Sequence, residues 1–335
     1  MFKNIICCTF IVLGFALKAQ DLHYSQFYHH PQSQNPAFLG FFDGDHRVYV
    51  NGRQQWRTVP VNYLTASLLF DSKFFVKHSS SYIGWGIGID YDQAGDSKLN
   101  LAKLSGGISY MHSIGTKHQL GLGIMPSISQ RRFQDEKLRW DLQWDGERYD
   151  PSLSPQESFE NVGSFYFDLG AGALYSYKYK TRTRIHLGAG FYHLNKPNQA
   201  FYGANTIDAK LPIRQAFQAA VQIPVFPILD IIFHGQRQSQ EKYEETNLSA
   251  LLRLYVNRKP GSLFNILAGC GLRMEDAYYP TLAIEYNNWM VSGSYDFNKS
   301  SFKTATDQRG GSEIAMRYIF KSVKPLGFYK KCPIY

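Results

Sequence analysis

The chain has 335 residues, of which 44% are hydrophobic, 16% aromatic and 19% charged, and its formal net charge is +9. Its 23 Tyr, 24 Phe and 28 Gly are unusual for a cytosolic enzyme and typical of an outer-membrane β-barrel, which places aromatic rings at both membrane interfaces and small residues toward the lumen. The basic balance is compatible with nucleic acid, with anionic lipid head groups or with an acidic protein partner.

A secretory signal peptide is predicted over residues 1–19. It has a basic start at Lys3, an apolar run over residues 5–17 and a small residue at Ala19, so cleavage is expected between Ala19 and Gln20. An exported chain seldom meets nucleic acid, which leaves lipid or an acidic partner as the interpretation of its charge. No later apolar run is long enough for a spanning helix, so the exported protein is either secreted in soluble form or a β-barrel.

The four cysteines fall into two groups. Cys7 and Cys8 lie within the apolar run of the signal peptide and are expected to leave with it. Cys270 and Cys332 remain. Two thiols make no disulfide framework, and whether these two pair stays open.

Residues 20–44 have neither a helical nor a strand period. Prolines and an Asn-Pro step keep this stretch from pairing as a strand, so we expect an extended peptide at the periplasmic mouth or in the lumen of a barrel, acting as an ordered plug. Its polar side chains would bond to lumen groups while its rings fill space. The adjacent His29 and His30 would point in opposite directions, which disfavours a shared metal ion. The predicted plug residues are Tyr24, Gln26, Phe27, Tyr28, Asn35, Pro36 and Phe38.

Residues 45–321 show the decisive pattern, in which large apolar residues alternate with Gly, Ser and charged residues; residues 81–91 are a clear example. The apolar set would face lipid and the small, polar set the lumen. A soluble β-sandwich also alternates, but here aromatic residues gather at strand ends and the segments are longer than ordinary globular strands. The strands are predicted at 45–56, 60–71, 81–91, 99–112, 118–131, 163–179, 182–194, 212–224, 227–239, 246–258, 263–274, 278–286, 288–298 and 311–321.

The predicted fold is therefore all-β, a closed antiparallel transmembrane barrel of about fourteen strands with both termini in the periplasm. Connections after even-numbered strands are mostly short, as periplasmic turns are, whereas those after odd-numbered strands include the long segments 132–162, 195–211 and 299–310. Two connections break this rule, because the first extracellular loop is short and the periplasmic turn at 71–80 is long. The number of strands could therefore differ from fourteen by two.

The long loop 132–162 is expected to be extracellular, and it is acidic in an otherwise basic chain. Tryptophans beside carboxylates make it a candidate protein-contact surface. The acids could instead gather a calcium ion, but their spacing matches no EF-hand, which favours a solvated or partner-facing loop. The candidate partner-binding residues are Trp140, Asp141, Trp144, Asp145, Glu147, Tyr149 and Asp150.

Catalytic and metal-binding motifs are missing from the sequence. It contains neither HExxH nor GxSxG, and its ten His residues are scattered, so we expect no enzymatic activity and no cofactor other than the calcium weighed above. The tail 322–335 is basic and is expected in the periplasm. There it would contact acidic partners, inner-leaflet lipid or only solvent.

Several stretches in order resemble the PorP/SprF family of type IX secretion system outer-membrane proteins of Bacteroidetes. "QDLHYSQFYHHPQSQNPAFLG" at 20–40 resembles the N-terminal stretch of that family, and "RVYVNGRQQW" at 47–56 resembles its first strand. "YDPSLSP" at 149–155, "HLNKPNQAF" at 193–201, "DAYYPTLAIEYNNWMVSGSYDFN" at 276–298 and the final "KCPIY" resemble later landmarks. Each motif is weak alone, and the ordered set is specific. The landmark residues are His193, Asn195, Pro197, Asn198, Asp276, Pro280, Tyr286 and Tyr295.

The resemblance implies a non-enzymatic barrel in the cell outer membrane that serves type IX secretion and gliding motility. One branch of the family is similar to the core component, which associates with periplasmic ring proteins and a peptidoglycan-binding lipoprotein. The other resembles members dedicated to one large secreted adhesin, which they recognise through its C-terminal signal domain. The sequence leaves both open, and the acidic, Trp-bearing loop favours the second. A plugged transport barrel for small solutes is the alternative function.

Overall fold

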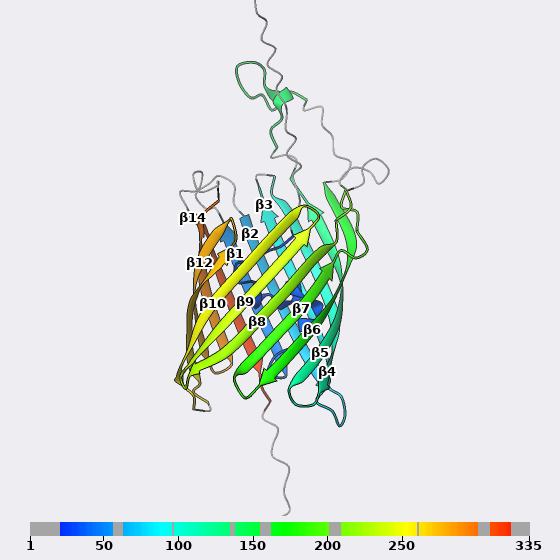
Figure 1. Cartoon of the computed structure of the whole chain (residues 1–335). Helices are drawn as coiled ribbons and strands as arrows, with labels where there is room; N and C mark the ends of the chain where they lie inside the picture. Colours follow the sequence, from blue (N-terminus) through cyan, green and yellow to red (C-terminus); the bar gives the residue numbers. More distant parts are fainter. Residues whose placement is uncertain are drawn as a thin grey trace, which may run out of the picture.

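The computed structural model describes residues 21–55, 63–95, 97–134, 138–154, 162–200, 209–259, 261–300 and 309–322. Within these residues the chain forms fourteen strands that close into one antiparallel barrel (Figure 1). The strands are β1 (His46–Gln55), β2 (Tyr63–Phe75), β3 (Tyr82–Ala94), β4 (Leu99–Ile114), β5 (His118–Arg132), β6 (Gly163–Tyr179), β7 (Thr183–Tyr192), β8 (Arg214–Phe226), β9 (Leu229–Gln240), β10 (Tyr243–Asn257), β11 (Phe264–Arg273), β12 (Ala277–Tyr286), β13 (Trp289–Asn298) and β14 (Arg309–Phe320).

The barrel is closed by β1, which pairs with β14. In this pair His46 lies opposite Phe320 and Gln55 lies opposite Gly311, without a break in register. Each of the other strands pairs with its neighbours in the sequence. Closure leaves no open sheet edge, which is the condition for a β-structure to cross a bilayer. The predicted closed antiparallel barrel is confirmed.

The second strand is longer than predicted. The sequence predicts an end at residue 71, whereas β2 continues to Phe75. The polar residues that begin at Asp71 have the composition of a turn, but Asp71 points into the lumen, where it is fully buried and bonds to Arg47. The strand therefore keeps its alternation through this run and ends with Phe74 exposed on the outer wall. Phe75 has the opposite orientation and packs against Tyr82 of β3 at the rim of the barrel.

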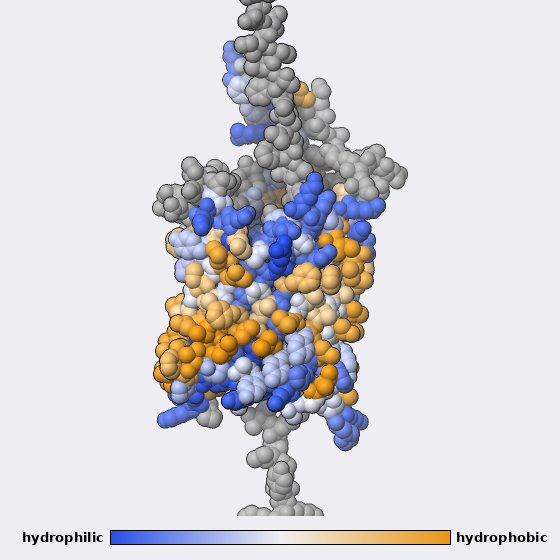
Figure 2. Space-filling model, viewed as in Figure 1, coloured by the Kyte–Doolittle hydropathy of each residue, from blue (hydrophilic) through white to orange (hydrophobic). Residues whose placement is uncertain are grey.

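Large apolar side chains cover the outer wall. In β3, Ile83, Ile87 and Ile89 are exposed while Asp90 is buried, as the alternation predicts. On the face drawn in Figure 2, apolar side chains cover much of the wall between hydrophilic rims. Exposed aromatic residues lie toward the strand ends at both rims: Phe74, Phe75, Tyr179, Phe226, Tyr286, Trp289 and Phe320 at one, and Phe165, Tyr278 and Tyr295 at the other. No helix in the described parts of the chain is long and apolar enough to span a membrane.

The two ends of the barrel differ in their connections (Figure 1). At one end, residues 133–162 join β5 to β6 and residues 193–213 join β7 to β8. At the other end, the longest connections are residues 76–81 and 258–263. Outer-membrane barrels have short periplasmic turns and long extracellular loops. We therefore call the first the extracellular end and the second the periplasmic end.

Three predictions fall on residues outside those described. They concern the signal peptide over 1–19 with its cleavage before Gln20, residues 323–335 of the basic tail, and Cys332. Cys270 carries a free thiol on the exposed face of β11.

Candidate functional site: the lumen and the N-terminal segment

Residues 21–44, which we call the lumen segment, lie inside the barrel. The segment starts toward the extracellular end, where Asp21 contacts His193, just beyond β7. It ends at the periplasmic end, where the N–H of Asp45 bonds to the carbonyl of Phe320. Most of the side chains in between are buried. The segment therefore runs along the lumen and is not confined to the periplasmic mouth.

The lumen segment forms three short helical turns: η1 (Phe27–His29), α1 (Pro31–Gln34) and η2 (Pro36–Phe38). The expectation of an extended peptide is therefore wrong. Pro31 and Pro36 each occupy the first position of a turn, where a fixed φ suits the helix and the missing N–H leaves nothing unbonded. Asn35 caps the last turn, because its side-chain oxygen accepts the N–H of Ala37 at 2.9 Å.

Glycines on the lumen face of β3, β5, β6 and β7 form the wall against which the segment packs. A Cβ added at Gly84 would lie 2.2 Å from the carbonyl oxygen of Leu39, and one at Gly190 would lie 2.2 Å from that of Gln34. The other glycines that approach the segment this closely are Gly88, Gly123 and Gly172. These residues alternate with lipid-facing ones because only a wall without side chains leaves room for the backbone of the segment.

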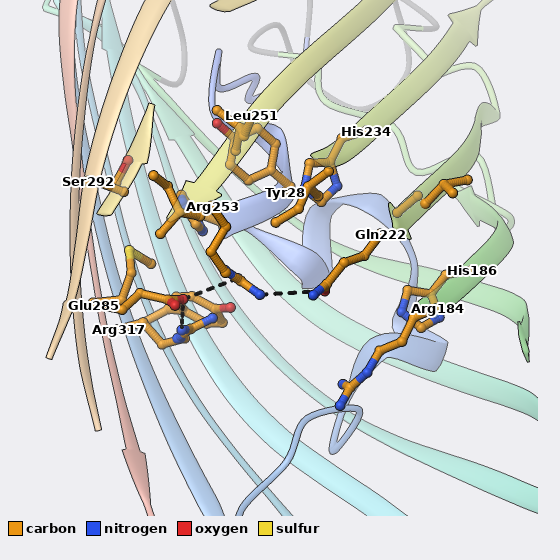
Figure 3. Close-up of a pocket in the computed structure, with 18 residues that line it drawn as sticks. Tyr28, Arg184, His186, Gln222, His234, Leu251, Arg253, Glu285, Ser292 and Arg317 are labelled. Atoms are coloured by element: carbon orange, nitrogen blue, oxygen red, sulfur yellow. Dashed lines mark hydrogen bonds and ion pairs between the residues drawn. The ribbon is translucent and has the colours of Figure 1, made fainter. Parts of the chain in front are cut away.

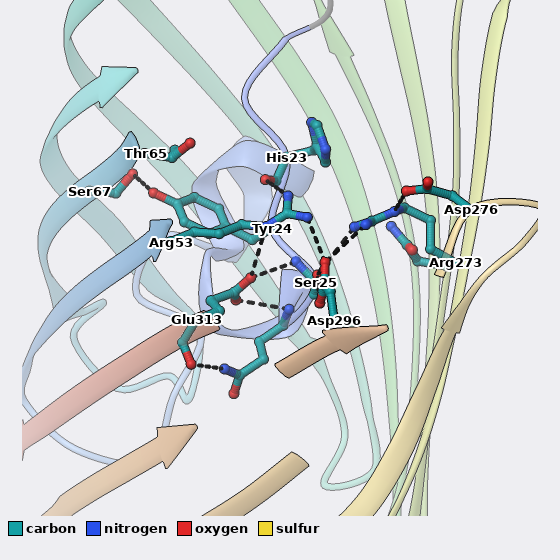
Figure 4. Close-up of polar contacts among 12 residues, drawn as sticks. His23, Tyr24, Ser25, Arg53, Thr65, Ser67, Arg273, Asp276, Asp296 and Glu313 are labelled. Carbon is teal, nitrogen blue, oxygen red and sulfur yellow. Dashed lines mark hydrogen bonds and ion pairs between the residues drawn. The ribbon is translucent and has the colours of Figure 1, made fainter. Parts of the chain in front are cut away.

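A buried ion network holds the extracellular half of the segment (Figure 4). Asp296 on β13 binds Arg53 of β1 at 2.7 Å and Arg273 of β11 at 2.9 Å. Ser25 of the segment donates its hydroxyl to Asp296 at 2.7 Å. The side chains of the three charged residues are 2% exposed or less. Removing one member would leave an uncompensated buried charge, so the network fixes the position of Ser25.

The backbone of the segment is bonded by the same part of the wall. Glu313 of β14 accepts the N–H of Ser25 at 2.7 Å and that of Gln26 at 2.9 Å. Arg53 donates to the carbonyl oxygen of His23 at 2.9 Å. Backbone groups that are buried in the lumen thus bond to charged side chains, and hydrogen bonds to charged groups are stronger than those between neutral groups.

A second network ties the segment to β2 and β3. Tyr24 shares a hydrogen bond of 2.6 Å with Ser67, which in turn donates to Asp90 at 2.6 Å. The ring of His30 binds the same carboxylate, with 3.0 Å between Nε2 and Oδ1. The neighbouring His29 instead lines a cavity on the other side of the segment.

The start of the segment is held by charges at the extracellular end. Asp21 lies 2.8 Å from Nε2 of His193 and 3.1 Å from Nε of Arg214. The other ring nitrogen of His193 lies 3.0 Å from Asp168 of β6. Burial alone would lower the pKa of His193, but Asp21 and Asp168 outweigh it and raise the pKa to about 9. The imidazolium is therefore present at neutral pH and links the segment to the wall.

The periplasmic end of the segment is held at Asp71. Its carboxylate accepts the N–H of Gly40 at 2.9 Å and two hydrogen bonds from Arg47, at 2.9 and 2.6 Å. Ser109 of β4 donates to the carbonyl oxygen of Leu39 at 2.7 Å. The last part of the segment before β1 is thereby bonded to three strands.

The structure places all the predicted plug residues in the lumen: Tyr24, Gln26, Phe27, Tyr28, Asn35, Pro36 and Phe38. What the sequence reasoning missed is their partners on the wall. The available signal was a charged residue on a lumen face of otherwise small residues, such as Glu313 after two glycines in β14. Which charges meet depends on closure of the barrel and cannot be read from one strand.

The described part of the acidic loop, residues 138–154, folds back on itself at the extracellular end. A short turn, η4 (Asp141–Gln143), precedes a hairpin in which Trp144 pairs with Tyr149. The carboxylate of Asp145 accepts two backbone N–H groups of the hairpin, both at 2.8 Å. Trp144 is 57% exposed, so the indole is available to a partner.

The predicted loop residues do not form a single cluster. Trp144, Asp145 and Glu147 are exposed, whereas Tyr149 turns back and bonds to Gln143. Asp150 bonds to its own turn through Ser152. Among the described residues, no three His, Cys, Asp or Glu side chains are grouped as a metal ion would need, and calcium binding by Asp141 and its neighbours stays a prediction.

The family-like landmarks lie in three places. His193 belongs to the network at the extracellular end. Asp276 binds Arg273 at 2.5 Å, and the same arginine binds Asp296. Three landmarks bond within the connection 193–213 or between it and β6: Asn195, Pro197 and Asn198. Three are exposed on the outer wall: Pro280, Tyr286 and Tyr295.

The family model described as "Type IX secretion system membrane protein PorP/SprF" matches residues 16–318. The chain belongs to the PorP/SprF family. Comparison with curated proteins found no match. As a closed barrel of this family, the protein lies in the outer membrane and is a membrane component of type IX secretion.

Solved structures similar to this PorP/SprF barrel include transport proteins. The "CymD monoaromatic hydrocarbon channel" is 11% identical, covers 88% of this chain and 93% of its own, and gives a TM-score of 0.48. The P. putida toluene transporter TodX is 11% identical, with coverage of 86% and 93% and a TM-score of 0.49. A Pseudomonas aeruginosa FadL homologue is 10% identical, with coverage of 85% and 93% and a TM-score of 0.45. At these identities the likeness concerns the fold alone.

Proposed function

We propose that this PorP/SprF protein is a non-enzymatic docking barrel whose lumen is closed by its own N-terminal segment. The observation that carries the proposal is that buried bonds join the segment to strands on opposite sides of the barrel, through Asp296 and Glu313 on one side and Asp90 and Arg214 on the other. Passage of a substrate through the lumen would require breaking these bonds and exposing buried charges. Docking of a protein at either mouth requires neither.

The partner would be one of two kinds. Periplasmic ring proteins and a peptidoglycan-binding lipoprotein of the secretion machine would dock at the periplasmic end. The C-terminal signal domain of a large secreted adhesin would dock at the end where the adhesin is displayed. Exposed apolar side chains on the extracellular loop, Leu142, Trp144 and Leu153, support the second kind, because such residues beside acids are typical of protein contact surfaces.

The alternative is a plugged transport barrel for small solutes. A cavity of about 150 Å³ beside the lumen segment favours it. Liposome swelling distinguishes the two functions: a solute that enters through the purified barrel without the secretion machine would support transport, and exclusion of small sugars would support docking.

Site-specific photo-crosslinking in living cells tests the docking function. A photoreactive residue at Trp144 samples the extracellular loop, one at His78 samples a periplasmic turn, and one at Ile87 on the lipid-facing wall is the matched control. We expect one or more type IX components or a surface adhesin to be captured at Trp144 or His78 and not at Ile87. The same set of proteins at all three positions would contradict the proposal.

A further inference from the structure

A cavity of about 150 Å³ lies between the lumen segment and the wall from β7 to β14 (Figure 3). The segment contributes Tyr28 and His29, which lie on one side of the space. The wall contributes three arginines and one carboxylate, Arg184, Arg253, Arg317 and Glu285, together with an apolar set. This is the face of the segment opposite the glycine wall.

The charged residues form the rim of the cavity on its periplasmic side. Arg184 is near the periplasmic start of β7, and Glu285 and Arg317 are near the periplasmic ends of β12 and β14. Their side chains are 35%, 13% and 23% exposed, and that of Arg253 is 20% exposed. The rim is thus partly exposed to solvent at the periplasmic end of the barrel.

The rim carries more positive than negative charge. Glu285 is shared by Arg253 at 3.3 Å and Arg317 at 3.0 Å, and Arg184 is paired outside the cavity with Asp43 at 2.7 Å. Three guanidinium groups therefore face two carboxylates. The Nε atoms of Arg253 and Arg317 are buried and donate to no described residue.

The inner end of the cavity is mostly apolar, although His234, which stacks on Tyr28, and Ser292 also line the space. Ile232, Leu251, Leu267 and Ala283 form one buried cluster, against which Tyr28 packs. A cavity of about 150 Å³ with such a lining accommodates an apolar group about the size of benzene. The space is thus two-sided, with an apolar pocket behind a cationic rim.

We propose that this cavity binds a carboxylate that carries a short apolar group, either a free short-chain acid or the C-terminal residue of a polypeptide. The apolar group enters the cluster around Leu251, and the carboxylate bonds to the partly exposed guanidinium groups of Arg253 and Arg317. A compact anion such as phosphate would satisfy the rim but leave the apolar end empty. The inference depends on the outer-membrane topology and not on the docking function.

Calorimetric titration of the full-length protein in lipid nanodiscs tests the site. The probes are isocaproate and N-acetyl-leucine, with their neutral amides isocaproamide and N-acetyl-leucinamide as controls of equal shape. We expect each acid to bind about tenfold or more tightly than its amide, as the loss of a charge-assisted bond predicts. Stronger binding of N-acetyl-leucine indicates a polypeptide end as the ligand, and stronger binding of isocaproate indicates a free acid.

Substitutions separate the site from general attraction of anions. Arg317→Gln should weaken both acids about tenfold. Ala283→Leu, which fills the apolar end without changing charge, should abolish binding. The matched control is Arg258→Gln, which removes a positive charge at the same end of the barrel from a side chain outside the cavity.

Three outcomes would overturn the proposal. They are equal binding of acids and amides, equal weakening by Arg317→Gln and Arg258→Gln, and binding of inorganic phosphate as strong as that of the acids. If Arg317→Gln fails to fold, Ala283→Leu and the comparison of acid with amide still test the site. Neither of these two measurements depends on the outcome of the crosslinking test of docking.

Discussion

A single methyl group at Gly190 tests how tightly the lumen segment is packed. In Gly190→Ala the new Cβ would lie 2.2 Å from the carbonyl oxygen of Gln34 and 3.1 Å from Cα of Asn35, inside the ordinary contact distance of about 3.5 Å. Both neighbours are backbone atoms, so no rotation of a side chain relieves the clash. The segment must therefore move away from β7.

Overpacking of a filled site costs about 1–3 kcal/mol. This cost falls on the docked state of the segment. At about 1.4 kcal/mol per factor of ten, it raises the undocked population about 5- to 140-fold. Gly293→Ala on β13 is the matched control, because a Cβ there meets no atom within 4 Å.

Hydrogen exchange measures this population. The N–H groups of Asn35 and Phe38 bond to the carbonyls of Pro31 and Asn35 and should be protected while the segment is docked. We expect their exchange to accelerate by the factor above in Gly190→Ala and to stay unchanged in Gly293→Ala. Equal protection in the two variants would refute the close packing on which the closed lumen depends.

Three further predictions concern the anchors of the segment and the loop. The pKa of His193 is raised from 6.5 to about 9, so its contribution to docking is complete below pH 6.5 and is lost as the pH rises through 9. Protection of the first amides of the segment from hydrogen exchange, corrected for the intrinsic exchange rate, should therefore fall between pH 6.5 and 9. In His193→Gln the same protection should not change with pH. Asp296→Asn leaves Arg53 and Arg273 without their shared carboxylate and should lower the free energy of unfolding in urea by about 3–5 kcal/mol, whereas a loss under about 1 kcal/mol would mean an uncoupled network. Replacing 138–154 with a Gly-Ser linker should leave the barrel folded and reduce surface display of a type IX substrate, and unchanged display of every substrate would remove the loop from the docking account.

The barrel could be predicted from the sequence because strand alternation is local. Each strand shows, within about ten residues, which side chains face lipid and which face the lumen. The end of β2 is predicted too early for the same reason, because the prediction depends on local sequence alone. A buried charge on the lumen face and the first polar residue of a turn look alike in the sequence, and Asp71 fits both descriptions. Only its partner Arg47, on another strand, distinguishes the two.

The lumen segment could be predicted to leave the sheet, but its conformation could not. Proline at the first position of a helical turn and proline in an extended chain differ only in the residues that follow, and four-residue turns leave no period to detect. The wall residues that hold the segment are still harder to predict from the sequence. Ser25 and Asp296 are 271 residues apart, and barrel closure alone brings them together.

Ion conductance of the purified protein in a planar bilayer tests the central claim most directly, namely that residues 21–44 close the lumen of an outer-membrane docking barrel. The bonds to Asp296, Glu313, Asp90 and Asp71 predict a barrel that stays closed at rest, with no steady current above that of the bare bilayer. A steady current proportional to voltage, of the kind that an open porin carries, would contradict the account.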